Sequence, residues 1–149
     1  MSNLVLINAS CADQTVDAVV NAANDGLWAG GGICGVIFKK AGMAALAAAC
    51  KKYKTPLKDG SAVITPAFQM KNTKYIIHAV GPDFGRTPKA FKELFDAYYN
   101  SLYVLMVPRT ESSLLRSGGE AVMRAFKALT YVFRSIGCNL LDKLCAFIV

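Results

Sequence analysis

The sequence predicts an α/β fold, a three-layer α/β/α sandwich with a central mixed sheet. The main observation is that short runs rich in β-branched residues alternate with segments whose apolar residues recur at helical spacing. The chain has 149 residues, of which 54% are hydrophobic, so it can bury one core and is too apolar for global disorder. We therefore expect a single domain spanning residues 1–149.

The expected strands are short apolar runs bounded by turn residues. They are predicted at Leu4–Ile7, Ala18–Asn21, Ser61–Thr65, Tyr75–Val80 and Leu144–Val149. The first two are apolar on both faces, which predicts a central position in a sheet covered on both sides. Asp59-Gly60 precedes the third strand, and Gly81-Pro82 stops the fourth.

Four helices are expected between the strands. They are predicted at Ile33–Ala41, at Met43–Lys52, in a long segment that starts at Thr87-Pro88, and around Val122–Phe133. The long segment repeats large apolar residues at helical spacing, which predicts a buried stripe. Its members are Phe91, Leu94, Phe95, Tyr98, Leu102 and Leu105.

Residues 19–42 carry the strongest functional signal. A β-branched run ends at Asn21 and Asn24, and Gly30, Gly31 and Gly32 follow before a helical segment begins. Carboxamides at the carboxyl end of a strand, a loop whose backbone can approach a ligand, and a helix N-terminus together suit a phosphate or diphosphate. The alternative is that the glycines only form a tight turn.

Three ordered blocks resemble the macro domain family. They are Asn21–Asn24 (N-A-A-N) with its glycine loop and helix-ending Ala41-Gly42, then Tyr75–Pro82, and more loosely Asp17–Val20. The resemblance covers about residues 4–106, whereas residues 107–149 match poorly. Proteins of this family bind ADP-ribose, and many remove it from modified side chains or cleave O-acetyl-ADP-ribose. The resemblance implies ADP-ribose or an ADP-ribosylated protein as the partner.

The resemblance also implies roles for single residues. Asn24 would be the candidate catalytic residue, which binds the distal ribose and positions the attacking water. A carboxamide cannot act as a general base, so its role in catalysis would be positioning. Asn21 would either contact the ligand or fix the loop through backbone hydrogen bonds. The other expected ligand-binding positions lie in the loop and the first helical turn: Gly30, Gly31, Gly32, Ile33 and Cys34.

The chain departs from the family pattern at several places. Cys34 stands where many family hydrolases have an aspartate, and it is either a small packing residue or a thiolate activated by the helix N-terminus. At the adenine end Ser10 occupies the position of the family aspartate, and Asp13 is a possible substitute. The family's second ligand loop is matched only weakly, at Ser117, Gly118 and Gly119.

Charge and cysteine usage limit the partners. The net charge of +7 fits either a solvated lysine-rich surface or a field that attracts anions such as a diphosphate or RNA. Aromatic residues do not interleave with the lysine clusters, so nucleic acid is a possible but not a favoured partner. Apolar stretches stop short of the roughly 20 residues of a membrane span, so no membrane partner is expected.

The five cysteines are odd in number and lack C-x-x-C spacing, which favours reduced thiols in a cytoplasmic setting. We also expect a monomer. No metal site is expected, because the single histidine, His78, has no cysteine near it in sequence. No cofactor is expected either. His78 lies in an apolar run and is expected to be structural.

Three functions remain open at this point. The first is a hydrolase of ADP-ribosyl linkages. The second is a non-catalytic ADP-ribose-binding module, which Cys34 and the unmatched C-terminal third favour. The third is a nucleic-acid-binding relative, which only the positive charge favours.

Overall fold

A computed structural model describes residues 4–5, 8–86, 90–106 and 147–148 of the chain. The helix start predicted at Thr87-Pro88 and the last helix predicted around Val122–Phe133 lie outside these residues.

The central sheet of the described part contains three strands in the order β2-β4-β3. Their bounds are Ala18–Ala23 for β2, Ala62–Pro66 for β3 and Tyr75–Val80 for β4. Strand β2 is parallel to β4, with Val19 opposite Ile76, and β3 is antiparallel to β4. The predicted mixed sheet is therefore confirmed, and β4 has the predicted bounds.

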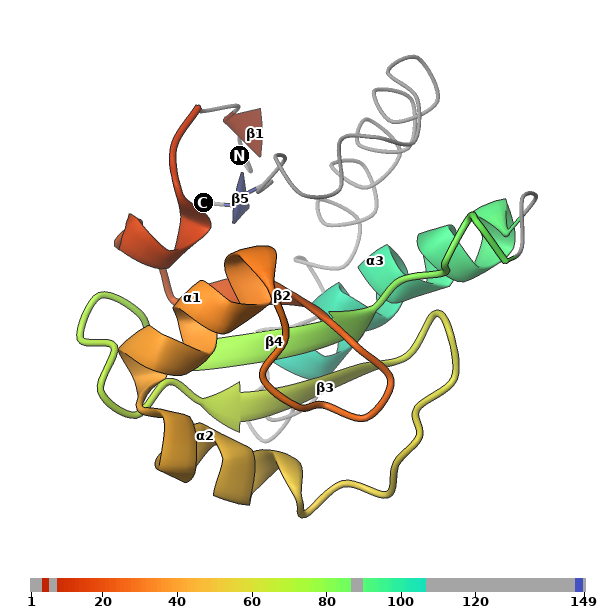
Figure 1. Ribbon diagram of the computed structural model, residues 1–149. Coiled ribbons are helices and arrows are strands. Elements are labelled where there is room, and N and C mark those ends of the chain that lie inside the picture. Colours follow the sequence, from red (N-terminus) through yellow and green to blue (C-terminus); the bar gives the residue numbers. More distant parts are fainter. Residues whose placement is uncertain (1–3, 6–7, 87–89, 107–146, 149) are drawn as a thin grey trace.

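Helices cover both faces of this sheet. Their bounds are Gly32–Ala41 for α1, Met43–Cys50 for α2 and Phe91–Met106 for α3. In Figure 1, α1 lies in front of the sheet, α2 lies below the arrowhead of β3 in this view, and α3 crosses behind the sheet, so the three-layer architecture is confirmed. A short 3-10 turn, η1 (Cys11–Asp13), precedes β2.

The main core lies between the front helices and the sheet. Its largest side chains come from all of these elements, and each is at most 1% exposed: Val19, Ile37, Phe38, Leu46 and Ile76. Burying such a side chain contributes about 1.5–3 kcal/mol, so this cluster fixes how α1 sits on the strands. Helix α1 begins at Gly32, one residue before the predicted start, and Gly42 at φ 91° separates it from α2.

The predicted position of the first strand in the central sheet is wrong. Strand β1 (Leu4–Val5) pairs antiparallel with β5 (Phe147–Ile148) in a separate two-stranded sheet. Strand β2 is also not covered on both faces, because its burial alternates and Val20 is 39% exposed. Composition does not determine which strand pairs with β1. It also does not require both faces of β2 to be buried, because surface positions tolerate apolar residues.

The predicted buried stripe of α3 is also wrong in part. Phe91 and Phe95 are 60% and 39% exposed, whereas the buried residues of α3 are Ala97 and Ser101, each 4% exposed, and Ala90, just before the helix, is 2% exposed. These small side chains let α3 approach the sheet closely. The other large members of the predicted stripe are only half-buried: Leu94, Tyr98, Leu102 and Leu105.

Two smaller differences concern the ends of elements. Helix α2 stops at Cys50, two residues before its predicted end, and β3 includes Pro66 as its last residue. No single described helix is long and apolar enough to cross a membrane. Together α1 and α2 have the length and apolar composition of a membrane span, but they are bent by 107° relative to each other.

Candidate functional site

The loop that joins β2 to α1 begins with a tight turn. The N–H of Leu27 donates to the carbonyl of Asn24 over 3.1 Å and closes the turn. Leu27 has φ 57°, a conformation that side-chain-bearing residues adopt at a cost, and its side chain is only 2% exposed. Burial of this leucine therefore anchors the turn to the core.

The carboxamide of Asn24 fixes the next part of the loop. Its Oδ1 accepts the N–H of Trp28 over 3.1 Å, and its Nδ2 donates to the carbonyl of Trp28 over 2.8 Å. Fixing the loop through backbone hydrogen bonds was one of two roles expected for Asn21, but the structure gives it to Asn24. One Nδ2 hydrogen and the second Oδ1 lone pair of Asn24 remain available to a ligand.

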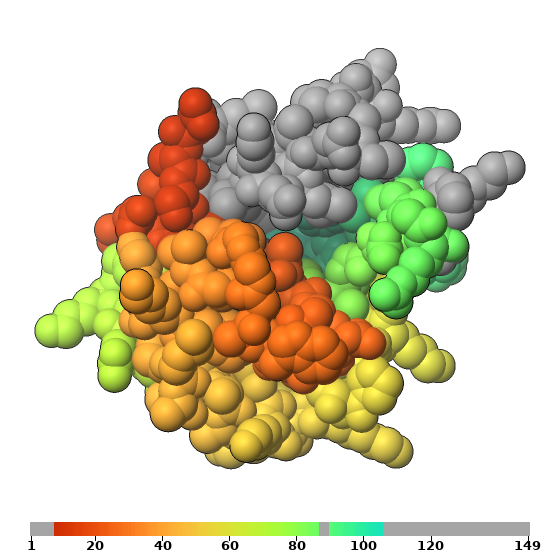
Figure 2. All heavy atoms as spheres, viewed as in Figure 1, coloured from red at the N-terminus to blue at the C-terminus, as the bar shows by residue number. Residues whose placement is uncertain are grey.

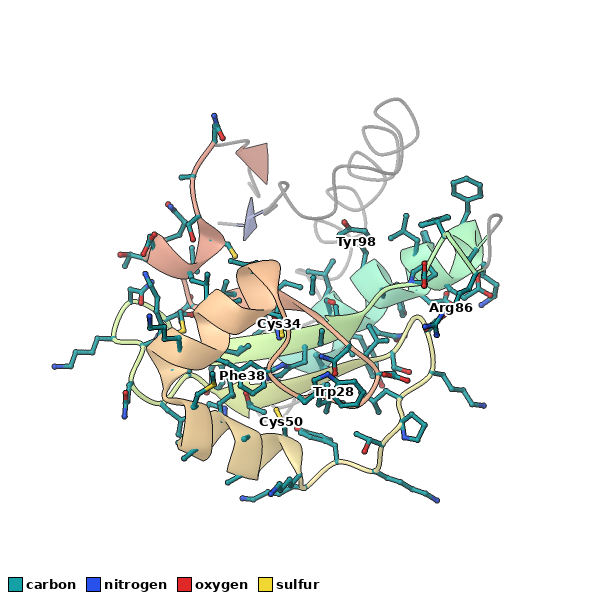
Figure 3. All side chains as sticks on the ribbon, viewed as in Figure 1. Trp28, Cys34, Phe38, Cys50, Arg86 and Tyr98 are labelled. Carbon is teal, nitrogen blue, oxygen red and sulfur yellow. The ribbon has the colours of Figure 1, made fainter. Side chains whose placement is uncertain are left out.

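Trp28 is a feature of this loop that the sequence reasoning missed. Its side chain is 61% exposed, and Figure 3 shows it in front of the sheet. Its ring packs over Gly26, where an added Cβ would lie 1.6 Å from a ring carbon. The only available signal was that Trp28 is the single tryptophan of the chain.

The glycine run opens the N-terminus of α1 to solvent. Gly31 is the N-cap and has no side chain with which to cap the helix, while Gly32 adopts φ 55°. Within the described part of the chain, an added Cβ at either residue would meet nothing within 4 Å. The first-turn N–H groups, which include those of Ile33 and Cys34, have no acceptor within the helix and carry its positive dipole end, so this point suits an anion.

The glycine loop also packs tightly against the helix that it starts. An added Cβ at Gly35 would lie 2.6 Å from the carbonyl oxygen of Gly30. Gly30 in turn lies beside Asn24, because its own Cβ would be 3.4 Å from Asn24 Nδ2. The predicted ligand-binding positions from Asn24 to Ile33 therefore lie in one continuous segment that reaches the surface at the glycine loop, seen in orange in Figure 2, whereas the side chain of Cys34 is buried beneath it.

Beneath this segment runs a buried polar chain. Asn21 is fully buried, and its Nδ2 lies 3.1 Å from His78 Nδ1 and 3.6 Å from Cys34 Sγ. His78 Nε2 lies 3.0 Å from Thr65 Oγ1. The amide assignment makes Nδ1 the acceptor and leaves the proton on Nε2. Asn21 Oδ1 is buried and has no hydrogen-bond partner among the residues that the structure describes.

His78 is held in its neutral form. Burial lowers its pKa from 6.5 to about 4, and its ring meets Phe38 edge-on at 6.2 Å between centroids. Since His78 is 0% exposed, its side chain cannot reach a ligand at the surface loop. The structure thus places this residue in the core, as expected from the apolar run around it.

The described cysteines are buried packing residues. Cys34 is 4% exposed and its thiol donates to the carbonyl of Trp28 over 3.7 Å, so the packing interpretation fits it better than an accessible thiolate. For Cys50, burial first and the nearby charge of Cys34 second raise the pKa to about 11. Among the residues that the structure describes, no group of three His, Cys, Asp or Glu side chains could hold a metal ion.

The expected adenine-end residues lie at the other end of α1. Asp13 forms an ion pair with Lys40, in the last turn of α1, and the Ser10 carbonyl accepts a hydrogen bond from Gln14 Nε2. The structure therefore does not bring Ser10 and Asp13 directly to the glycine loop. The remaining predicted site residues lie outside the described part: Ser117, Gly118 and Gly119.

Sequence comparisons find relatives for the central part of the chain. An uncharacterized protein of Fusobacterium nucleatum is 49% identical over 89 residues, which are 58% of this chain and 49% of that protein. The non-structural polyprotein of rubella virus, strain Therien, is 47% identical over 94 residues, which are 61% of this chain and 4% of the polyprotein. The chain thus spans about half of the first relative and a small part of the second.

Solved structures show the same architecture. The Oceanobacillus iheyensis macrodomain with ADP aligns with a TM-score of 0.64 and 26% identity, over 89% of this chain and 81% of that one. The Trypanosoma brucei macrodomain in complex with ADP-ribose aligns with a TM-score of 0.56 and 28% identity, over 65% and 39% of the two chains. The family model of the Macro domain matches residues 20–117, and the chain belongs to this family.

Proposed function

We propose that this protein binds ADP-ribose and hydrolyses ADP-ribosyl linkages, in mono-ADP-ribosylated proteins or in O-acetyl-ADP-ribose. The observation that carries the proposal is the open glycine loop at the N-terminus of α1, with free space in front of Gly31 and Gly32. Similar macrodomains hold ADP-ribose or ADP in their solved structures, which supports the same ligand class here.

The binding step uses backbone groups. The diphosphate accepts hydrogen bonds from the first-turn N–H groups, including those of Gly32 and Ile33, and these bonds are charge-assisted. The positive end of the helix dipole adds to them. The net charge of +7 attracts the ligand over a longer range.

The chemical step depends on positioning. His78 cannot serve as the base, because it is fully buried and its pKa is about 4. Asn24 uses its remaining N–H and lone pair to hold the distal ribose and to orient a water against the anomeric carbon. As the bond from the water oxygen to this carbon forms, the bond from the carbon to the acceptor breaks, and the departing acceptor takes the proton that the water loses. In O-acetyl-ADP-ribose the water attacks the acetyl carbonyl carbon instead, the ester bond breaks, and the ribose oxygen takes the proton. No side chain of the buried network acts as the base.

A second candidate is an ADP-ribose-binding module without turnover. Cys34 favours it, because its buried thiol cannot replace the aspartate that the family resemblance leads one to expect. The hydrogen bonds of Asn24 to Trp28 also favour it, because both ends of the carboxamide already have backbone partners.

Single-turnover release of ADP-ribose from a mono-ADP-ribosylated peptide separates the two candidates. The parent should release ADP-ribose, Asn24→Ala should release it about 10²-fold more slowly, and Cys34→Ser should match the parent. Equal and negligible release by all three proteins, with tight binding of ADP-ribose by the parent, would favour the binding module.

The net positive charge also keeps RNA as a third candidate. Binding of a short RNA that weakens steeply with salt and that ADP-ribose does not displace would support a nucleic-acid-binding role instead.

A further inference from the structure

Three features of the loop after β2 hold the indole of Trp28 at the surface. Asn24 binds both backbone groups of Trp28, Gly26 leaves space for the ring, and the buried Leu27 anchors the turn in spite of its φ of 57°. Folding alone would gain by burying the indole, yet 61% of the side chain stays exposed.

Trp28 lies next to the glycine loop, on its Asn24 side. Its carbonyl oxygen is 3.7 Å from Cys34 Sγ, in the first turn of α1, and 2.8 Å from Asn24 Nδ2. Under the proposed function, Asn24 holds the distal ribose, which is the part of ADP-ribose that is linked to the acceptor. A group attached to that ribose therefore leaves the site on the side where the indole is exposed.

We propose that Trp28 is a specificity-determining residue that contacts the polypeptide carrying the ADP-ribose, at residues next to the modified side chain. This inference rests on the proposed function and adds the partner of the same site. Large, rigid aromatic side chains are the residues that most often supply binding energy at protein interfaces. The hydrogen bonds to Asn24 fix the Trp28 backbone in advance, which lowers the entropy lost on binding.

The charges around the turn favour a polypeptide over a nucleic acid or another polyanion. Asp25 is exposed at the turn, three residues before Trp28, and its carboxylate repels phosphate groups. The carbonyl of Asp25 accepts the N–H of Leu57 over 2.8 Å, which brings the exposed Lys58 to the same region. Mixed charges of this kind suit a polypeptide, whereas a polyanion needs a uniformly basic path.

Trp28 is also the reporter for the test, because it is the single tryptophan of the chain. We would titrate the full chain with free ADP-ribose, a peptide that carries ADP-ribose through a linkage resistant to hydrolysis, and the same peptide unmodified, and follow tryptophan emission and calorimetric heat. The modified peptide should change the emission of Trp28 more than free ADP-ribose does. Equal changes with both ligands would overturn the proposal.

Variants give the second readout, which is the affinity for the modified peptide divided by the affinity for free ADP-ribose. Trp28→Ala should lower this ratio by on the order of tenfold, and Trp28→Phe should restore most of it. The matched control is Tyr75→Ala, because Tyr75 is 40% exposed at the other end of the sheet, where β4 begins, and its ratio should equal that of the parent. Thermal unfolding of each variant checks its fold.

Three results would overturn the proposal. They are an unchanged ratio in Trp28→Ala, an equal loss for both ligands, and a larger loss for oligomeric ADP-ribose than for the peptide, which would assign the indole to a polyanion. Failure of the proposed function looks different, because the parent would then give no heat with free ADP-ribose. Failure of the Trp28 proposal alone leaves that heat intact.

Discussion

Asn21 and His78 form a buried hydrogen-bonded pair, with 3.1 Å between Nδ2 of the asparagine and Nδ1 of the histidine. The pair joins β2 to β4, and through Cys34 it also reaches the first turn of α1. The bond requires an unprotonated Nδ1, and burial keeps the imidazole neutral. Protonation of His78 at Nδ1 therefore breaks this hydrogen bond and destabilises the folded state directly beneath the candidate site.

This pair predicts a loss of stability in mild acid. The pKa of His78 is about 4 in the folded state, and in the unfolded chain it takes the ordinary histidine value of 6.5. Between pH 4 and pH 6.5 the unfolded chain therefore binds more protons than the folded chain does. The free energy of unfolding should therefore fall as the pH falls below about 6.5, by about 2 kcal/mol between pH 7 and pH 5. Urea unfolding at a series of pH values measures this slope.

The control is His78→Gln, which removes the single histidine of the chain. Carboxylates titrate mainly below this window and thiols above it, so the slope between pH 7 and pH 5 should nearly vanish in the variant. The same slope in parent and variant would show that His78 is not the titrating group.

The contact between Gly35 and Gly30 predicts an indirect loss of binding. In Gly35→Ala the new Cβ would lie 2.6 Å from the carbonyl oxygen of Gly30, which is backbone and cannot rotate away. The loop must shift, so both the melting temperature and the affinity for ADP-ribose should fall, the affinity by on the order of tenfold. Calorimetry and thermal unfolding measure the two effects.

Gly31→Ala is the matched control for the fold. Its Cβ would meet no atom of the described residues within 4 Å, and φ at Gly31 is −82°, which alanine adopts readily. Its melting temperature should stay close to that of the parent. If Gly35→Ala binds ADP-ribose as tightly as the parent, the position of the glycine loop does not matter for the ligand.

The two hydrogen bonds between Asn24 and Trp28 predict a double effect of Asn24→Ala. Loss of the bonds should lower the free energy of unfolding by about 1–2 kcal/mol, because the backbone groups of Trp28 lose their partners. If Asn24 also orients the water, turnover should fall by more than affinity does. A loss of stability with equal losses in turnover and affinity would leave Asn24 as a loop residue only.

The buried thiol of Cys50 should resist alkylation. Burial first and the charge of Cys34 second raise its pKa to about 11, so the thiolate is scarce at pH 8. Iodoacetamide should label Cys50 in the native protein at least tenfold more slowly than in urea, as peptide mass spectrometry would show. Equal labelling rates in both conditions would contradict the buried position.

The sequence predicted the elements around residues 18–80 because their signals are local. Alternating strands and helices with Gly42 and Gly60 at turns define the layers without knowledge of distant contacts. The pairing of β1 with β5 joins segments more than 140 residues apart, and local patterns do not encode it. The buried face of α3 was missed because close packing selected small residues there, not large ones.

The candidate site was predictable to a similar extent. The glycine loop and the two asparagines stood out as a motif, but their separate roles depend on which side chain lies in the core and which on the surface. Asn21 reaches His78 across the sheet, 57 residues away in sequence, and Asn24 reaches the backbone of Trp28. Only three-dimensional contacts distinguish the roles of the two asparagines. The exposure of the Trp28 indole likewise follows from the fold and not from the local sequence.

Calorimetric titration of the full chain with ADP-ribose tests the central claim most directly. The glycine loop at the N-terminus of α1 should bind ADP-ribose with a dissociation constant of micromolar order, because several charge-assisted hydrogen bonds are made to a preformed loop. Ribose alone should give no heat, since it lacks the diphosphate. The absence of both heat and a thermal shift at millimolar ADP-ribose would contradict the account.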